Sequence, residues 1–402
     1  MKILFDLYTS QYGSYHGGKE YAHAVFLKLC DKKNELELIN NNISIEIIYN
    51  PDDVIENIVI ETCNKNNIVI NYCKNHSDIN ILLNNNNYNI FYSPLPYSLK
   101  DLKIPSETKF IYTIHGLRSL ELPIHKYWNK FHKGKLYRKI IMTLMYRFNF
   151  IKNIILKKRI KYFGKIFLIT NNQKIITISQ HSRYSIAYYF PNVNINDIDV
   201  LYSPLKRYEL IKSSENNYLT SLSLESGKYI LLICGNITAK GCYLGCSVLY
   251  DLLNHSRFPK DIKIILIGVG NKNIYRKLVK NNPRFIFTGY VSSEELEILY
   301  KNAHLFLYPT LNEGFGYPPL EAMKYGTICA CSANSSLTEV YKDSIIYFNP
   351  YDQTEMSIRI LQSFDNEIRK EKAEKIKNIY KLITEKQNVD LDILTNMILS
   401  IK

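Results

Sequence analysis

Short apolar runs alternate with helical patterns along the first half of the chain. A helix is expected from about Lys19 to Leu29, directly after Gly17-Gly18. Strand-length apolar runs are found at Ile3–Leu7, Ser44–Tyr49, Ile68–Asn71, Ile90–Tyr92, Phe110–Ile114, Lys174–Ile178 and Asp199–Leu201. Strands that alternate with helices are typical of a doubly wound α/β domain with a parallel sheet.

The alternation begins again in the second half. Pro204 starts a polar stretch, through residues 213–217, that is the predicted inter-domain linker. Further strands are predicted at Tyr229–Cys234, Ile262–Ile267, Phe285–Phe287, Leu305–Tyr308, Ile328–Ala330 and Ile345–Phe348, with charged helices after Glu355. We therefore predict an α/β protein with domains at 1–205 and 206–380, which suits a chain of 402 residues. Periodicity alone allows several kinds of two-domain α/β protein.

Nearly all of the excess positive charge lies in one segment. The net charge is +14, and residues 122–196 contain no Asp or Glu but 15 Lys or Arg. Of these, 13 lie between Lys126 and Lys165, interleaved with aromatic side chains. The segment at about 126–165 is too long for a plain connection, so we expect an inserted pair of basic amphipathic helices in the N-terminal domain.

The composition of this basic segment suggests a partner. Basic residues mixed with rings suit an anionic membrane surface, where lysines meet phosphate and rings lie at the headgroup level. We expect Lys157, Lys158, Arg159 and Lys161 to contact such a surface or the acceptor. A solvated basic helix is the alternative. Nucleic acid is not an expected partner, because no nucleic-acid-reading motif accompanies the charge.

The cysteines and the apolar runs of the chain indicate the cellular compartment. The eight cysteines include no repeated C-x2-C pair, so a zinc site is not expected. The apolar run Ile3–Leu7 is too short for an export signal and contains Asp6. No uncharged apolar stretch approaches about 18 residues. We expect a cytoplasmic protein with reduced thiols, peripheral on the inner face of the membrane.

Two carboxylates, Glu313 and Glu321, are the most informative residues. Glu313 follows the apolar run Leu305–Tyr308 on a loop with two glycines, and Glu321 falls inside the helix that Pro318-Pro319 begins and Gly326 ends. Glycines allow backbone N–H groups to approach a ligand closely, and a helix N-terminus favours anions. Phosphate at the N–H groups, with carboxylates for sugar hydroxyls, describes a nucleotide-sugar pocket.

The run from Leu311 to Met323 closely resembles the Glu-x7-Glu signature of retaining glycosyltransferases of family 4, which have the GT-B fold. The resemblance extends from Phe287 to Asp352, over roughly the last third of the chain. It implies two Rossmann-like domains facing a central cleft. The N-terminal domain binds the acceptor, the C-terminal domain binds the nucleotide sugar, and a helix at 381–402 returns to the N-terminal domain.

The resemblance also assigns roles to the motif. It implies that Glu321 holds the ribose hydroxyls, that Glu313 holds the sugar hydroxyls, and that the backbone of Gly314, Phe315 and Gly316 supports sugar and phosphate. Val291 matches a position whose backbone meets the nucleobase.

A second group of candidates lies on the loop at 235–241, after the strand Tyr229–Cys234. Loops after parallel strands bind ligands in α/β sheets. Lys240 is placed to meet a diphosphate, whose charge it would offset as the diphosphate leaves. The family often has Arg where Asn236 stands, so we expect Lys240 to be the main phosphate-binding cation of this loop. A surface lysine is the alternative for Lys240.

The N-terminal half supplies candidates for the acceptor side. His115-Gly116-Leu117-Arg118 follows a strand and resembles the family's Ile-His-Asp-Leu-Arg run, whose His lies beside the donor sugar. Gly17 and Gly18 resemble the first loop, which lies against the donor diphosphate. Arg183, with Ser179 and His181, follows another strand and is a further candidate for the cleft.

We therefore predict a metal-independent retaining glycosyltransferase without a cofactor. Its donor would be a UDP-, GDP- or dTDP-sugar, and its acceptor a saccharide, expected to be lipid-linked, in surface polysaccharide, lipopolysaccharide or glycolipid synthesis. Two D-x-D strings, Asp197–Asp199 and Asp390–Asp392, are not placed for a metal. The alternatives are a nucleotide-sugar epimerase or hydrolase on the same fold and a non-catalytic, glycosyltransferase-like binding subunit.

Overall fold

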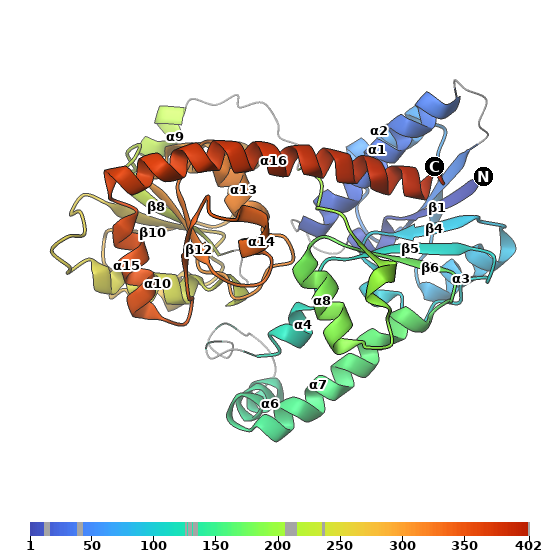
Figure 1. Ribbon diagram of the computed structural model, residues 1–402, viewed down its shortest axis with the longest axis horizontal. Helices are drawn as coiled ribbons and strands as arrows, with labels where there is room; N and C mark the ends of the chain where they lie inside the picture. Colours follow the sequence, from blue (N-terminus) through green and yellow to red (C-terminus); the bar gives the residue numbers. More distant parts are fainter. Residues whose placement is uncertain are drawn as a thin grey trace. The chain divides into compact units, whose positions relative to one another are not determined.

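The computed structural model of the chain divides into two compact units (Figure 1). It describes residues 1–11, 17–37, 43–124, 127, 131, 136–205, 215–234 and 238–400. Unit 1 comprises Met1–Leu120, Leu156–Arg207 and Thr384–Lys402, and unit 2 comprises Glu121–Ile155 and Tyr208–Ile383. Most of the predicted linker lies outside the described residues.

Unit 1 is built on a parallel sheet whose seven strands, among the described residues, have the order β3-β2-β1-β4-β5-β6-β7. The strand order reverses direction between β1 and β4. The strands are β1 (Lys2–Asp6), β2 (Ser44–Tyr49), β3 (Val69–Tyr72), β4 (Ile90–Ser93), β5 (Lys109–Ile114), β6 (Gln173–Thr177) and β7 (Ile198–Val200).

Unit 2 repeats this arrangement with a parallel sheet of six described strands in the order β10-β9-β8-β11-β12-β13. The reversal lies between β8 and β11, which pair in parallel register. The strands are β8 (Tyr229–Ile233), β9 (Lys263–Ile267), β10 (Phe285–Phe287), β11 (Leu305–Tyr308), β12 (Cys329–Ser332) and β13 (Ile346–Phe348). The predicted fold class, with two Rossmann-like sheets, is confirmed.

The apolar runs become strands because central parallel strands are covered on both faces. All four residues of β11 are fully buried, and so is every residue of β8 except the half-buried Ile233. Each strand predicted from an apolar run is present, and no end is shifted by more than two residues.

The helices connect and cover these strands. The described helices are α1 (Gly17–Glu37), α2 (Asn57–Lys65), α3 (His76–Asn85), α4 (Arg118–Glu121), α6 (Leu136–Arg147), α7 (Asn149–Gly164), α8 (Gln180–Tyr189), α9 (Glu215–Ser221), α10 (Cys242–Leu252), α11 (Lys272–Leu278), α12 (Ser293–Asn302), α13 (Tyr317–Met323), α14 (Leu337–Tyr341), α15 (Gln353–Gln362) and α16 (Asn366–Ile398). Pro318 lies in the first turn of α13, as its missing N–H allows.

The C-terminal part of α16 packs within unit 1. Asp392 accepts an ion pair from Lys32 at 2.8 Å, and the side chain of Gln387 donates to the Ser203 carbonyl at 2.6 Å. Asp390 accepts the Tyr202 backbone N–H at 2.6 Å. Asp390 and Asp392 are therefore occupied by contacts within the protein.

The basic segment forms the pair of helices α6 and α7, but its grouping differs from the prediction. We expected the whole of 126–165 to belong to the N-terminal domain. Residues 121–155 instead group with unit 2, and only the part from Leu156 onward groups with unit 1. In unit 2, Tyr127 and Phe131 pack against Tyr243, with ring centroids 4.7 and 5.7 Å away.

Candidate functional site

Two loops of unit 2 meet where the strand order reverses. One follows β8 and includes the 3-10 turn Thr238–Lys240, and the other follows β11. The backbone N–H of Leu311 donates to the Ala239 carbonyl at 2.7 Å, which ties the loops together. Ligands of open α/β sheets bind at such a reversal, outside the carboxyl ends of the strands.

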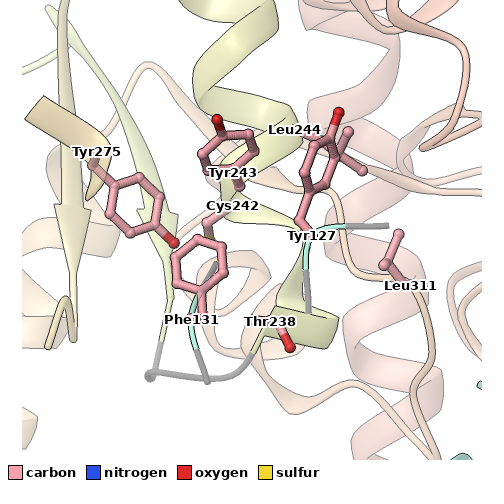
Figure 2. A pocket seen from close by; sticks show the side chains of 9 residues that line it. Tyr127, Phe131, Thr238, Cys242, Tyr243, Leu244, Tyr275 and Leu311 are labelled. Atoms are coloured by element: carbon pink, nitrogen blue, oxygen red, sulfur yellow. The ribbon is translucent and has the colours of Figure 1, made fainter. Parts of the chain in front are cut away.

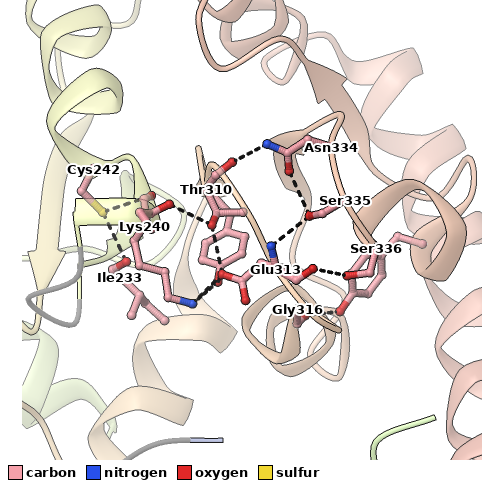
Figure 3. Close-up of polar contacts among 12 residues, drawn as sticks. Ile233, Lys240, Cys242, Thr310, Glu313, Gly316, Asn334, Ser335 and Ser336 are labelled. Atoms are coloured by element: carbon pink, nitrogen blue, oxygen red, sulfur yellow. Dashed lines mark hydrogen bonds and ion pairs between the residues drawn. The ribbon is translucent and has the colours of Figure 1, made fainter. Parts of the chain in front are cut away.

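Glu313 and Lys240 meet at this point (Figure 3). Lys240 Nζ lies 2.8 Å from Glu313 Oε1, and the side chains are only 14% and 9% exposed. The same Oε1 accepts the Tyr308 hydroxyl at 2.6 Å and the Thr310 hydroxyl at 3.0 Å. Lys240 also donates to the Tyr308 hydroxyl. Among the described residues, one ammonium and two hydroxyl groups therefore contact this buried carboxylate.

The backbone around Glu313 is fixed by serines that follow β12. The Glu313 N–H donates to Ser335 Oγ at 2.9 Å, and Ser336 Oγ donates to the Glu313 carbonyl at 3.1 Å (Figure 3). The Tyr341 hydroxyl donates to the carbonyl of Gly316. Gly316 has φ +93°, and a Cβ there would lie 2.4 Å from Leu337. The turn before α13 thus requires glycine at this position.

Glu321 lies inside α13 and has a separate partner. It is 4% exposed and accepts the Tyr300 hydroxyl at 2.8 Å. Tyr300 is on α12, which a capping box begins: Ser292 Oγ accepts the Glu295 N–H at 3.1 Å, and the Glu295 carboxylate accepts the Ser292 N–H at 2.7 Å. The two carboxylates of the motif are thus both buried, but each has its own hydrogen-bond partners.

The structure describes some of the other residues that were predicted to bind the donor. Asn236 lies outside the described residues. Val291 is on the loop after β10, where the Gly268 N–H donates to the Gly289 carbonyl at 2.8 Å. Gly17 and Gly18 are the first residues of α1 and not a loop before it. The prediction of a helix from Lys19 was therefore late by two residues.

The acceptor-side candidates of the prediction lie in unit 1. His115 Nε2 is 2.9 Å from the Pro94 carbonyl, and its ring meets the edge of Tyr21 with centroids 4.5 Å apart. Arg118 begins α4. Arg183 donates through Nε and Nη2 to the Ile195 carbonyl at 3.1 and 3.0 Å, which gives it a role within its own unit.

The reversal point of unit 1 holds a buried carboxyl group that the sequence reasoning passed over. Asp6 ends β1 and is fully buried. It accepts the Thr9 N–H at 3.0 Å, and the hydroxyls of Thr9 and Ser93 at 2.6 Å each. Burial raises the pKa of Asp6 to about 6, although the hydrogen bonds from Ser93 and Thr9 oppose the increase.

The basic residues on α7 are not equivalent. Lys157, Lys158 and Lys161 are exposed. Arg159 is half-buried and donates to the Ser119 carbonyl at 2.8 Å, and burial lowers its pKa. Arg159 is therefore occupied within the protein and is a poor surface contact.

A small aromatic pocket adjoins the Lys240 loop. Its ring walls are Tyr127, Phe131, Tyr243 and Tyr275, and Leu311, two residues before Glu313, completes one side (Figure 2). The rings of Phe131 and Tyr275 have centroids 5.6 Å apart. No local sequence pattern indicates this pocket, because its walls come from segments that are far apart along the chain.

The described residues contain neither a metal-binding cluster nor a membrane-spanning helix. No cluster of three or more His, Cys, Asp or Glu side chains there is arranged to hold a metal ion. Within the same ranges, no helix combines the length and hydropathy needed to cross a bilayer.

The comparison with known families concerns the unit that holds Glu313 and Lys240. Residues 218–382 match the family Glycosyl transferases group 1. The match runs from α9 into α16 and includes every strand of the unit 2 sheet.

Curated relatives agree with this match over short regions. An O-antigen chain mannosyltransferase B of Escherichia coli is 42% identical over 22% of this chain and 23% of its own length. The O-antigen chain mannosyltransferase RfbU of Salmonella typhimurium is 25% identical over 44% of this chain and 47% of its own length. The chain thus spans less than half the length of these relatives.

Solved structures match over nearly the whole chain. A glycosyltransferase of Rickettsia africae has 15% identity and a TM-score of 0.63, with 99% of this chain and 98% of that chain covered. HepE of Anabaena in complex with UDP-glucose has 13% identity and a TM-score of 0.63, with 100% and 98% covered. The lipopolysaccharide glycosyltransferase WaaG has 14% identity and a TM-score of 0.63, with 97% and 99% covered. The chain therefore has the GT-B fold of these glycosyltransferases.

Proposed function

We propose that the chain is a glycosyltransferase of surface polysaccharide synthesis, which moves a sugar from a nucleotide diphosphate sugar to a saccharide acceptor. The observation that carries this proposal is the buried Glu313 paired with Lys240 at 2.8 Å, at the ligand-binding edge of the sheet in unit 2. The match of residues 218–382 to a glycosyltransferase family supports it. The named activities of the relatives, O-antigen mannosyl transfer, support the choice of pathway class.

The donor roles follow the resemblance of the motif to retaining family 4. Lys240 faces the diphosphate and offsets its charge as it leaves, which stabilises the transition state electrostatically. Glu313 accepts sugar hydroxyls and Glu321 accepts ribose hydroxyls, because ionised carboxylates accept and cannot donate. The backbone of Gly314, Phe315 and Gly316 supports the sugar and the phosphate. The departing phosphate oxygen takes the acceptor proton, and the configuration of the sugar is retained.

The acceptor is a lipid-linked saccharide at an anionic membrane surface. Apolar side chains on α6 support this: Leu136, Ile140 and Leu144 are 73%, 51% and 36% exposed and share one helix face, here called the α6 stripe. The absence of acidic residues from 122 to 196 in the sequence provides the charge complement. The acceptor binds to unit 1 near His115, Gly17 and Gly18, and Arg118 is a candidate contact for it.

The test is a transfer assay. The protein is incubated with UDP-, GDP- and dTDP-linked sugars, including mannose and glucose, with and without lipid extract from a polysaccharide-producing bacterium. We expect a glycolipid product that requires both donor and extract, with the anomeric configuration of the donor. Loss of donor without a product would favour a hydrolase, and a changed sugar without acceptor would favour an epimerase. If no donor is consumed or bound, the proposal is wrong.

A further inference from the structure

Glu313 accepts hydrogen bonds from two hydroxyl groups in addition to its ion pair with Lys240. Tyr308 is the last residue of β11 and is fully buried, and Thr310 is also fully buried. Their hydroxyls lie 2.6 and 3.0 Å from the same oxygen that accepts Lys240, which is Glu313 Oε1. Because Lys240 donates to the Tyr308 oxygen, the hydroxyl proton of Tyr308 is directed to Glu313.

This arrangement matters when Lys240 acts on a ligand. In the proposed function, the ammonium group offsets the charge of the donor diphosphate, so it must turn partly or wholly from Glu313. Glu313 would then remain as a carboxylate of 9% side-chain exposure without its cation. A buried charge left without its partner is strongly unfavourable unless other donors satisfy it.

We propose that Tyr308, assisted by Thr310, is a positioning residue that holds the Glu313 carboxylate in place when Lys240 leaves it for the donor diphosphate. The inference rests on the proposed function. A neutral hydroxyl suits the task, because it satisfies the carboxylate without competing for the diphosphate as a second cation would. Lys240 also lies 4.9 Å from the centroid of the Tyr308 ring, so the phenol contacts both partners of the exchange.

The Thr310 hydroxyl is the weaker of the two donors. It lies 3.2 Å from the Ala239 carbonyl as well as 3.0 Å from Glu313, so its single proton is shared between two acceptors. Tyr308 has the shorter contact with the carboxylate. We therefore expect Tyr308→Phe to have a larger effect than Thr310→Val.

The first experiment is calorimetric titration of UDP, GDP and dTDP into the full chain. For the nucleotide that binds the wild type, Tyr308→Phe should weaken binding roughly tenfold to a hundredfold, because the Glu313 carboxylate depends on this hydrogen bond most once Lys240 has turned to phosphate. The matched control is Tyr229→Phe, which removes another buried hydroxyl of the same sheet, 2.7 Å from the Leu299 carbonyl, and should leave affinity unchanged.

A second measurement separates this role from a merely structural one. In the free protein Lys240 still pairs with Glu313, so Tyr308→Phe alone should change the melting temperature little. In a Lys240→Met background Glu313 has lost the Lys240 ammonium, and Tyr308→Phe should then lower the melting temperature by roughly 2–4 °C or more. A purely structural hydroxyl would cause the same loss in both backgrounds.

The outcomes distinguish the two proposals. If a nucleotide binds the wild type and Tyr308→Phe with equal affinity, or if the melting losses are equal in both backgrounds, the positioning role of Tyr308 is overturned while the proposed function stands. If none of the three nucleotides binds the wild type, the proposed function fails, and the inference fails with it.

Discussion

A Cβ atom on Gly241 would lie 1.7 Å from the carbonyl oxygen of Pro309. Gly241 follows Lys240, and Pro309 follows Tyr308, so the contact joins the loops that bring Lys240 to Glu313. Gly241 also has φ +67°, a conformation that side-chain-bearing residues rarely adopt. The ion pair between Lys240 and Glu313 therefore depends on the close approach of these two backbone segments.

Gly241→Ala is therefore expected to destabilise the protein by more than ~2 kcal/mol and to weaken nucleotide binding, because the loops must move apart. Urea unfolding and nucleotide titration measure the two effects. Gly227→Ala is the matched control: its φ is +73°, but a Cβ there would meet no atom within 4 Å. The control should lose only ~1 kcal/mol and keep its nucleotide affinity. Equal losses in the two variants would refute the role of the Pro309 contact.

Glu313→Gln should reduce turnover by about a hundredfold or more while the protein stays folded. The amide has nearly the same shape, but it lacks the charge that pairs with Lys240 and the second strong acceptor for a sugar hydroxyl. Steady-state assays with circular dichroism as the folding check measure this. The control is Glu374→Gln, an exposed residue of α16, which should behave as the wild type. Near-normal turnover of Glu313→Gln would remove Glu313 from the site.

Lys240→Ala should weaken binding of the nucleoside diphosphate about tenfold or more. At ~4 Å and an effective dielectric of about 20, one ion pair contributes roughly 4 kcal/mol before desolvation is subtracted. Titration of the diphosphate against wild type and variant gives the ratio directly. Lys277→Ala, an exposed lysine of α11, serves as the control. An unchanged affinity in Lys240→Ala would mean that the ammonium does not face the phosphates.

The sequence allowed the strands to be predicted but not all of their pairings. Each strand comes from an apolar run such as Leu305–Tyr308, because both faces of a central parallel strand are buried. Strand order has no such local signal. The meeting of Lys240 and Glu313 depends on β8 lying beside β11, with β9 and β10 between them in the sequence. Only the resemblance to a known family linked these two residues in advance.

The contacts of Tyr308, Tyr127 and Phe131 could not be predicted from the sequence, and the reason is physical. Within a buried strand, Tyr308 looks like any other large core residue, and its hydroxyl is informative only because it lies at the carboxyl end. The grouping of Tyr127 and Phe131 with unit 2 was not predicted, because their packing on Tyr243 joins segments more than a hundred residues apart. Local patterns do not report such contacts.

The α6 stripe is the part of the protein that we expect to contact a lipid surface. Ile140→Ser combined with Leu144→Ser should weaken association with vesicles that contain phosphatidylglycerol about tenfold or more, because two apolar side chains no longer enter the lipid. Vesicle flotation measures the bound fraction. Ile358→Ser on α15, where the side chain is 51% exposed, is the control for general surface polarity.

The basic residues of α7 are tested in the same flotation assay. Replacing the exposed Lys157, Lys158 and Lys161 with Gln should reduce binding to anionic vesicles and reduce its salt dependence. Arg159→Gln should affect folding more than binding, since its guanidinium donates to the Ser119 carbonyl. Unchanged flotation in both the α6 and the lysine variants would refute the membrane proposal.

Asp6 should make the stability of unit 1 depend on pH. Burial raises its pKa from 3.8 to about 6, so the native state holds the proton more tightly than the unfolded state does. Its contribution to stability is therefore fully present below about pH 4 and is lost as the pH rises through about 6. The shift of about two units corresponds to ~3 kcal/mol.

Asp6→Asn removes this titration while keeping the shape. The amide oxygen can still accept the Thr9 N–H, and its NH₂ group can donate to the hydroxyls of Thr9 and Ser93, which accept as well as donate. The measurement is urea unfolding of both proteins at pH 4 to 7. We expect the wild type, and the control Asp251→Asn that keeps Asp6, to lose ~2–3 kcal/mol relative to Asp6→Asn between about pH 4 and pH 7. A pH-independent difference between wild type and Asp6→Asn would show that Asp6 is ionised over this whole range.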